Sequence, residues 1–153
     1  MEITYTDDLS SLTEGHLGAF FVGWPAAPSP AQHLAVLRGS YRAIVARDAT
    51  PGADGRVVGF ITMISDGVLT AFISWLEVLP SYQRRGIGSE LVKRILEGAE
   101  RFYSVDMLCD EPLQQYYRRF GMQAVPGMTL RHRSALAATA TRAAANPATA
   151  RLR

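Results

Sequence analysis

Two glycines one residue apart, with two arginines just before them, carry the clearest chemical signal in this chain of 153 residues. They lie in the segment Gln83–Ser89, which directly precedes an amphipathic stretch with helical spacing. The start of a helix offers backbone N–H groups without intrahelical partners and the positive end of the helix dipole. Gly86 and Gly88 have no side chains that would keep a diphosphate from those groups, and Arg84 and Arg85 add positive charge. The segment therefore predicts a diphosphate-binding loop.

The spacing G-x-G is a weak signal by itself, because glycines precede helices in many proteins for capping and packing alone. A P-loop would need G-x-x-x-x-G-K-[ST], and a dinucleotide fold would need G-x-G-x-x-G near its first strand. The sequence contains neither pattern. These two classes of phosphate-binding loop are therefore excluded.

The residues around the loop predict a mixed sheet with helices. β-Branched and aromatic residues, with turn signals such as Asp66-Gly67 between them, predict strands at 3–6, 41–47, 57–64, 68–79 and 105–109, and a final strand at 127–133. Apolar residues at helical intervals predict helices at 8–22, 31–38, 89–100 and 113–120. The prolines of segment 23–30 must end the first of these helices. The strand, helix and strand order from 68 to 109 implies a parallel pair, and the turns before it imply antiparallel neighbours.

Two blocks of the sequence resemble signatures of the GNAT superfamily of N-acetyltransferases. Gln83–Gly88 is similar to the acetyl-CoA signature [QR]-x-x-G-x-[GA], and Cys109–Met122 is similar to the strand, helix and [FY]-Y-x-x-x-G-[FM] turn that follow it. The resemblance covers about Ile3 to Arg133, and it is specific in these two blocks and vague in the first 70 residues. It implies an α/β (α+β) fold with a mixed, mostly antiparallel central sheet, flanking helices and a parallel pair that forms the cofactor cleft. Residues 1–133 are then the acetyltransferase domain.

The same resemblance implies acetyl-CoA as co-substrate. The main chain near Val78 would bond the pantetheine arm, and the amides from Arg84 to Ser89 would hold the diphosphate. The residues expected at the cofactor are Val78, Leu79, Gln83, Arg84, Arg85, Gly86, Ile87, Gly88 and Ser89. Val78 and Leu79 fit a plain core strand equally well, since main-chain contacts require no particular side chain.

Transfer of an acetyl group to an amine needs a group that protonates the leaving thiolate and a group that deprotonates the amine. Tyr117 occupies the position of the general acid in the members that it resembles; Tyr116 is the alternative, and a packed aromatic is the other interpretation of Tyr117. Glu77 is the one carboxylate of its strand and is expected to act as base, directly or through a water. A water chain without a dedicated base is the alternative, because Phe72–Trp75 lack a histidine or glutamate.

The acceptor site of this architecture usually draws on the first helices and their loop. Phe21 and Trp24, with the proline-rich turn and Trp75, would form an apolar, stiff wall there. They predict a small-molecule amine with an apolar or aromatic body, although such residues also form ordinary core. Cys109 is expected to be a small buried hydrophobe, so the acyl group passes directly to the amine without an acyl-enzyme.

Composition limits the partners. One cysteine and three scattered histidines predict no metal site. The chain carries a net charge of −5 up to Glu111 and +7 beyond it. Because those later arginines are interleaved with alanines, we expect a solvated surface and no nucleic-acid partner. No apolar run is long enough to span a bilayer, and the acidic N-terminus lacks the pattern of a secretion signal, so no membrane partner and a cytoplasmic location are expected. The Ala/Arg-rich segment 134–153 is expected to be a flexible tail outside the domain. The sequence leaves open whether the chain forms a homodimer.

Three other functions fit parts of this pattern. A CoA-binding regulatory module that lost turnover would explain the missing histidine or glutamate base. A protein or peptide N-acetyltransferase, acting on an N-terminus or a lysine, differs only in the acceptor. A nucleic-acid-associated protein would use the basic C-terminal stretch.

Overall fold

The fold is known from a computed structural model that describes residues 1–135. Its strands are β1 (Ile3–Thr6), β2 (Arg42–Asp48), β3 (Val57–Ser65), β4 (Thr70–Val78) and β5 (Ser104–Met107). Its helices are α1 (Pro30–Gly39), α2 (Ile87–Leu96) and α3 (Glu111–Arg118), with short 3-10 turns η1 (Glu14–His16), η2 (Pro80–Tyr82) and η3 (Ala99–Arg101). The predicted tail 134–153 lies outside the described residues except for its first two positions.

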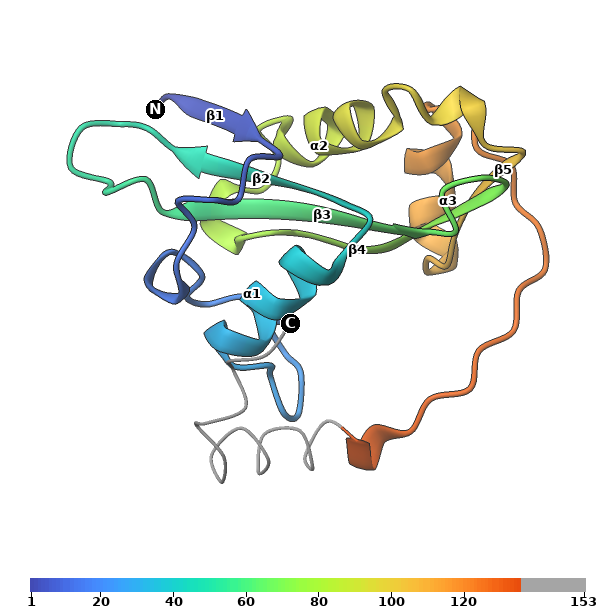
Figure 1. Cartoon of the computed structure of the whole chain (residues 1–153), viewed down its shortest axis with the longest axis horizontal. Helices are drawn as coiled ribbons and strands as arrows, with labels where there is room; N and C mark the ends of the chain where they lie inside the picture. Colours follow the sequence, from blue (N-terminus) through green and yellow to red (C-terminus); the bar gives the residue numbers. More distant parts are fainter. Residues whose placement is uncertain (136–153) are drawn as a thin grey trace.

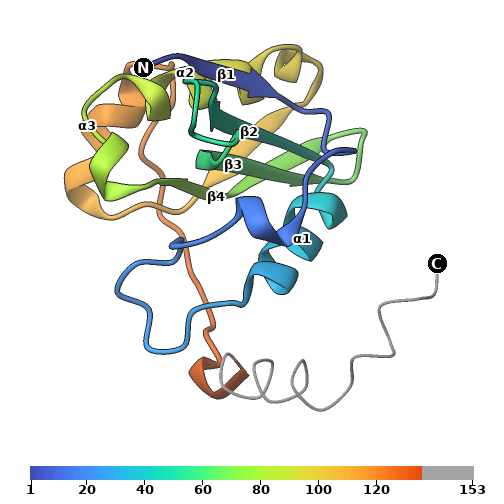
Figure 2. The same ribbon diagram turned by 90° about the vertical axis from the view of Figure 1, so that its left-hand side faces the viewer.

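The five strands form one sheet in the order β1-β2-β3-β4-β5. The first three pairings are antiparallel and β4–β5 is parallel, which confirms the predicted fold class. Helix α1 covers one face of the sheet and α2 the other, as Figures 1 and 2 show from two directions. The parallel pair is possible because α2 provides the crossover between β4 and β5.

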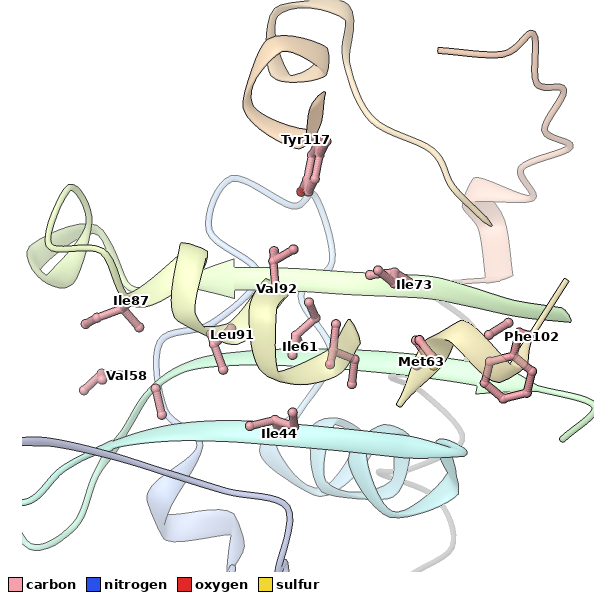
Figure 3. Close-up of a cluster of buried hydrophobic side chains, with 14 residues drawn as sticks. Ile44, Val58, Ile61, Met63, Ile73, Ile87, Leu91, Val92, Phe102 and Tyr117 are labelled. Atoms are coloured by element: carbon pink, nitrogen blue, oxygen red, sulfur yellow. The ribbon is translucent and has the colours of Figure 1, made fainter. Parts of the chain in front are cut away.

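Each face of the sheet has its own hydrophobic core. On the α2 face, Leu91 and Val92 are fully buried against Ile61 of β3 and Ile44 of β2 (Figure 3). On the α1 face, Leu34 and Leu37 of α1 lie in a second cluster that also holds Leu12, Leu17, Phe20, Phe21 and Phe60. Helix α1 starts cleanly because Ser29 and Gln32 form a capping box.

A β-bulge interrupts β4 beside its parallel partner. Thr62 of β3 pairs with Trp75 and Met63 pairs with Ile73, so Ser74 is an extra residue that has no partner on β3. In a regular strand Ile73 and Trp75 would point to the same face. Here Ile73 lies in the core under α2, whereas Trp75 contacts aromatic rings on the α1 side. The bulge lies where β4 and β5 separate, because β5 pairs only with Thr70–Ile73.

The predicted helix at 8–22 is wrong. Only η1 is helical there, and Ala19 and Phe21 adopt left-handed backbone conformations, with φ of 67° and 60°. Such conformations are incompatible with an α-helix. Leu12, Leu17, Phe20 and Phe21, which gave the helical spacing with Leu9, are nevertheless buried, because the segment folds as a loop over the α1 face. Tertiary packing thus replaces the local helical pattern.

The predicted strand at 127–133 is also wrong. The structure has no strand among residues 122–133, and Met128 and Leu130 are exposed. Pro126 cannot donate to a ladder, and Gly127 lies so close to Leu108 that a Cβ there would come within 2.7 Å of its side chain.

Among residues 1–135, no helix has the length and apolar character that a bilayer crossing requires. The other predicted strands and helices are confirmed, with ends that differ by at most four residues.

Candidate active site

The end of the parallel pair opens into a cavity. Beyond Ile73 and Met107 the two strands no longer pair, and a space of about 370 Å³ lies between them. Its walls come from β4 at 73–76, from 107–110 and from α3, and include Ser74, Cys109 and Tyr117. Thr129 and Arg131 complete the lining from the extended segment after α3.

The start of α2 has the backbone geometry expected of an anion site. Gly86, the residue before the helix, has φ of 81°, and Arg84 has φ of 60°. The first helical hydrogen bond runs from Glu90 N to Gly86 O at 3.0 Å. The amides of Ile87, Gly88 and Ser89 precede that bond and have no partner among the described residues. They are therefore available to an external acceptor.

Gly88 lies where the helix start meets the sheet and α3. A Cβ at this position would lie 3.3 Å from the Tyr116 hydroxyl and 3.7 Å from Val78 Cγ2. The helix start thus adjoins both β4 and the tyrosine pair of α3. Tyr116 in turn contacts the predicted acid Tyr117, with ring centroids 4.9 Å apart.

The structure gives several of the predicted cofactor residues partners within the protein. The Gln83 side chain donates to the Val78 carbonyl at 3.0 Å, and Leu79 N donates to Val58 O at 2.9 Å. Leu79 is buried in the core on the α1 face. Arg84 and Arg85 are exposed beside the helix start. The main chain of Val78 and Leu79 is thus partly engaged inside the fold, whereas the helix-start amides are not.

Tyr117 projects from α3 toward the sheet, above Val92 and Ile73 (Figure 3). Only 7% of its surface is exposed, and its ring meets Tyr116 edge-on at 4.9 Å. Burial, with smaller contributions from Tyr116 and Cys109, raises the pKa of Tyr117 to about 12. The hydroxyl therefore stays protonated at neutral pH and can donate a hydrogen bond in the cavity.

Glu77 holds the loop that precedes α1. Its carboxylate accepts the N–H of Phe21 at 2.8 Å and the N–H of Val22 at 3.3 Å. These bonds join positions more than fifty residues apart in the sequence. The carboxylate is thus already hydrogen-bonded. These two bonds use two of the four lone-pair positions of a carboxylate, so two positions stay available.

Phe21, Trp24 and Trp75 come together around a second cavity of about 220 Å³. The ring centroids of Trp24 and Trp75 are 5.4 Å apart, and Phe21 lies 5.3 Å from Trp24 and 6.4 Å from Trp75. Ala26, Pro28, Gln32 and Val36 form the rest of the wall. Trp75 also lines the cavity between β4 and β5, so this one residue borders both spaces.

A model of the acetyltransferase (GNAT) family matches residues 9–122. The chain belongs to this family. A candidate acetyltransferase of Deinococcus radiodurans R1 has 36% identity and a TM-score of 0.82, with 88% of this chain and 92% of that chain covered. This agreement supports the mixed sheet and its parallel edge as features of the GNAT fold.

Two curated plant proteins are also similar. GCN5-related N-acetyltransferase 3, chloroplastic, of Arabidopsis thaliana is 39% identical over 71 residues, which are 45% of this chain and 30% of that protein. Histone acetyltransferase TAP1 of Glycine max is 29% identical over 115 residues, 69% of this chain and 48% of that protein. The chain spans about a third to a half of the length of these relatives.

The residues of this GNAT chain fit acetyl-CoA, which members of the family generally use. The free amides of Ile87, Gly88 and Ser89, together with the absence of a Cβ at Gly86 and Gly88, suit a diphosphate. Among residues 1–135, no group of three or more His, Cys, Asp or Glu side chains could hold a metal ion.

Sequence reasoning missed two charged residues of the cavity, Asp110 and Arg131. We interpreted the arginines after position 112 as solvated surface, because their spacing among alanines has no pattern. Only the path of the extended segment after α3 brings Arg131 to the lining, and no signal in the sequence predicts that path.

Proposed function

We propose that this chain transfers the acetyl group of acetyl-CoA directly to a primary amine. The observation that carries the proposal is the row of unpartnered amides at the start of α2, where Gly88 adjoins Tyr116, the neighbour of the cavity residue Tyr117. Gln83, Arg84, Arg85 and the amides of Gly86 to Ser89 would hold the diphosphate, and the main chain near Val78 and Leu79 would face the pantetheine arm. Bound acetyl-CoA supplies a thioester carbonyl that an amine can attack.

We assign Tyr117 the role of hydrogen-bond donor to the leaving sulfur. A thiol has a pKa of about 8.5, well below the value of about 12 for the Tyr117 hydroxyl. Complete proton transfer from tyrosine to a free thiolate is therefore uphill, whereas a hydrogen bond that strengthens as charge develops is not. Its position in the cavity with Ser74 and Cys109 supports this role. Tyr116, whose hydroxyl approaches Gly88, is the alternative donor.

Glu77 is the proposed acceptor of the proton from the amine, directly or through a water. Its carboxylate keeps two unused lone-pair positions after the bonds from Phe21 and Val22 are counted. A water chain without a dedicated base competes with this assignment.

The cavity of Phe21, Trp24 and Trp75 is the proposed acceptor site. Trp75 borders this cavity and the one assigned to acetyl-CoA, so an amine whose body lies among the rings has a short route to the thioester. The apolar lining supports a small-molecule amine with an apolar or aromatic body. A protein acceptor is the second candidate, because the soybean relative is named a histone acetyltransferase.

The experiment measures two quantities. Acetyl-CoA should raise the melting temperature of the chain, because a ligand that binds only the folded state stabilises it. Thiol release from acetyl-CoA should then depend on an amine from a panel of arylalkylamines, polyamines, aminoglycosides, amino acids and peptides. A melting shift without thiol release for any amine would favour a CoA-binding regulatory module. No melting shift at saturating acetyl-CoA would refute the proposal.

Location and assembly stay predictions. We propose the cytoplasm, and the word chloroplastic in the name of the Arabidopsis relative applies to that protein. Gel filtration of the purified chain with and without acetyl-CoA tests the homodimer.

A further inference from the structure

We propose that Glu77 is a positioning residue that builds the acceptor pocket, by holding Phe21 in place for an amine with a flat, apolar ring. This inference rests on the proposed function of the aromatic cavity. It gives Glu77 a role that needs no proton transfer, since both of its carboxylate oxygens accept amide hydrogens of the loop.

The loop needs such an anchor because its backbone is unfavourable. Every second residue from Ala19 to Gly23 has a positive φ: 67° at Ala19, 60° at Phe21 and 80° at Gly23. For a residue with a side chain this conformation is sterically unfavourable, because Cβ crowds the following carbonyl oxygen. A turn bond from Trp24 N to Phe21 O at 3.2 Å closes the segment but does not tie it to the sheet. The tie to the sheet comes from Glu77 on β4.

The bonds to Glu77 determine the position of the Phe21 ring, which forms part of the cavity wall. Phe21 has 6% of its surface exposed, and its ring meets Trp24 and Trp75 edge-on. The amide bonded to Glu77 belongs to the same residue as this ring. Without the carboxylate, Phe21 can return to an extended conformation, which would carry its ring away from the two tryptophans.

The lining determines the kind of amine. Of the seven residues around the cavity none is charged, and the one polar side chain, Gln32, already accepts the Ser29 N–H at 2.7 Å through its carbonyl oxygen. A carboxylate or a second ammonium on the acceptor would have no charged partner in this space. An arylalkylamine places its ring among the aromatic walls and leaves only its amino group to reach past Trp75.

The two tryptophans of the chain give a direct readout of this pocket. Trp24 and Trp75 are the only tryptophans in the sequence, and both line the cavity. Tryptophan emission therefore reports on this pocket, and through Trp75 also on the adjoining cavity, with no need for turnover. The probe is 4-nitrophenethylamine, because a nitroaryl group quenches indole fluorescence at short range.

The experiment compares Glu77→Gln, Glu77→Asp and Glu77→Ala with the wild type, and uses Glu100→Gln as the control at an exposed position. Glutamine keeps the length of the side chain and one acceptor oxygen for the Phe21 N–H, gives up the longer bond from Val22, and cannot serve as a base. Aspartate keeps the carboxylate but is one methylene too short to reach the loop amides. The dissociation constant of the probe, and kcat and KM for the same amine, are measured for each variant.

A positioning role predicts that Glu77→Gln binds the probe within about threefold of the wild type. It also predicts that Glu77→Asp and Glu77→Ala lose about tenfold or more in probe affinity, with the loss appearing in KM. If Glu77 acts only as base, Glu77→Asp and Glu77→Ala bind the probe as tightly as the wild type, while Glu77→Gln loses kcat and Glu77→Asp keeps partial activity. Equal probe affinity in all variants would overturn the inference.

The melting shift with acetyl-CoA separates this inference from the proposed function. All variants should retain the shift, because Glu77 does not line the cavity assigned to acetyl-CoA. If the wild type shows no shift, the proposed function fails, whereas the order of probe affinities still tests the role of Glu77. Should Glu77→Ala fail to fold, the contrast between Glu77→Gln and Glu77→Asp decides the question.

Discussion

Acidification should destabilise this protein through His33. This histidine of α1 is 1% exposed and packs against the rings of Phe20, Phe21 and Phe60, with centroids 4.3 to 5.1 Å away. Neither ring nitrogen has a hydrogen-bond partner among the described residues. Burial lowers the pKa of His33 from 6.5 to about 4.

The direction and size of the effect follow from this difference in pKa. Below pH 6.5 the unfolded chain binds a proton at His33, and the folded chain does not until about pH 4. The contribution of His33 to the free energy of unfolding is therefore complete above pH 6.5 and falls as the pH drops toward 4. At pH 5.0 the loss amounts to about 2 kcal/mol.

Urea unfolding at pH 7.5 and 5.0, followed by circular dichroism, measures this loss. His33→Leu should remove most of the difference between the two pH values, and His132→Leu, at an exposed position, is the control. Asp48, whose pKa is lowered mainly by hydrogen bonds from Thr50 and then from Tyr82, loses its contribution at lower pH, outside this window. If His33→Leu keeps the same pH dependence as the wild type, the reasoning about the buried ring is wrong.

Three further substitutions test the site and the core. Tyr117→Phe should lower kcat by about a hundredfold or more in a thiol-release assay, while the melting shift with acetyl-CoA is kept; a full rate would remove Tyr117 from the chemistry. Gly86→Ala, at φ of 81°, should cost on the order of 1 kcal/mol and reduce the melting shift with acetyl-CoA. Gly39→Ala, at a helix end without positive φ, is its control. Leu91→Ala should lose about 2 to 5 kcal/mol in urea unfolding, because Leu91 is fully buried, whereas Val68→Ala, at an exposed position, should change little.

The sequence predicts most of the sheet and the three helices α1, α2 and α3, because periodicity and turn residues are local signals. It predicts α2 and the loop before it from the amphipathic pattern and the two glycines. The parallel pair follows from chain order, and the structure confirms it.

Two features depend on contacts that local patterns do not contain. The apolar spacing of residues 8–22 suits a helix, but left-handed residues and the bonds to Glu77 shape that segment as a loop. The bulge at Ser74 has no sequence signal, and alternation alone would place Ile73, Trp75 and Glu77 on one face. The aromatic cavity was nevertheless within reach of sequence reasoning, because Phe21, Trp24 and Trp75 are large apolar residues beside prolines and a strand.

The bulge at Ser74 has a consequence for changes in chain length. Ile73 and Trp75 pack on opposite faces of the sheet, as two adjacent residues of a regular strand without a bulge would. Deleting Ser74 should therefore leave both side chains where they are, whereas inserting a second residue there would shift the pairing of the rest of β4 with β3 by two positions or force a wider kink. Urea midpoints of the two length variants should differ accordingly, with the shortened chain close to the parent and the lengthened one well below it. Equal losses in both would mean that the extra residue is itself required for the sheet to form.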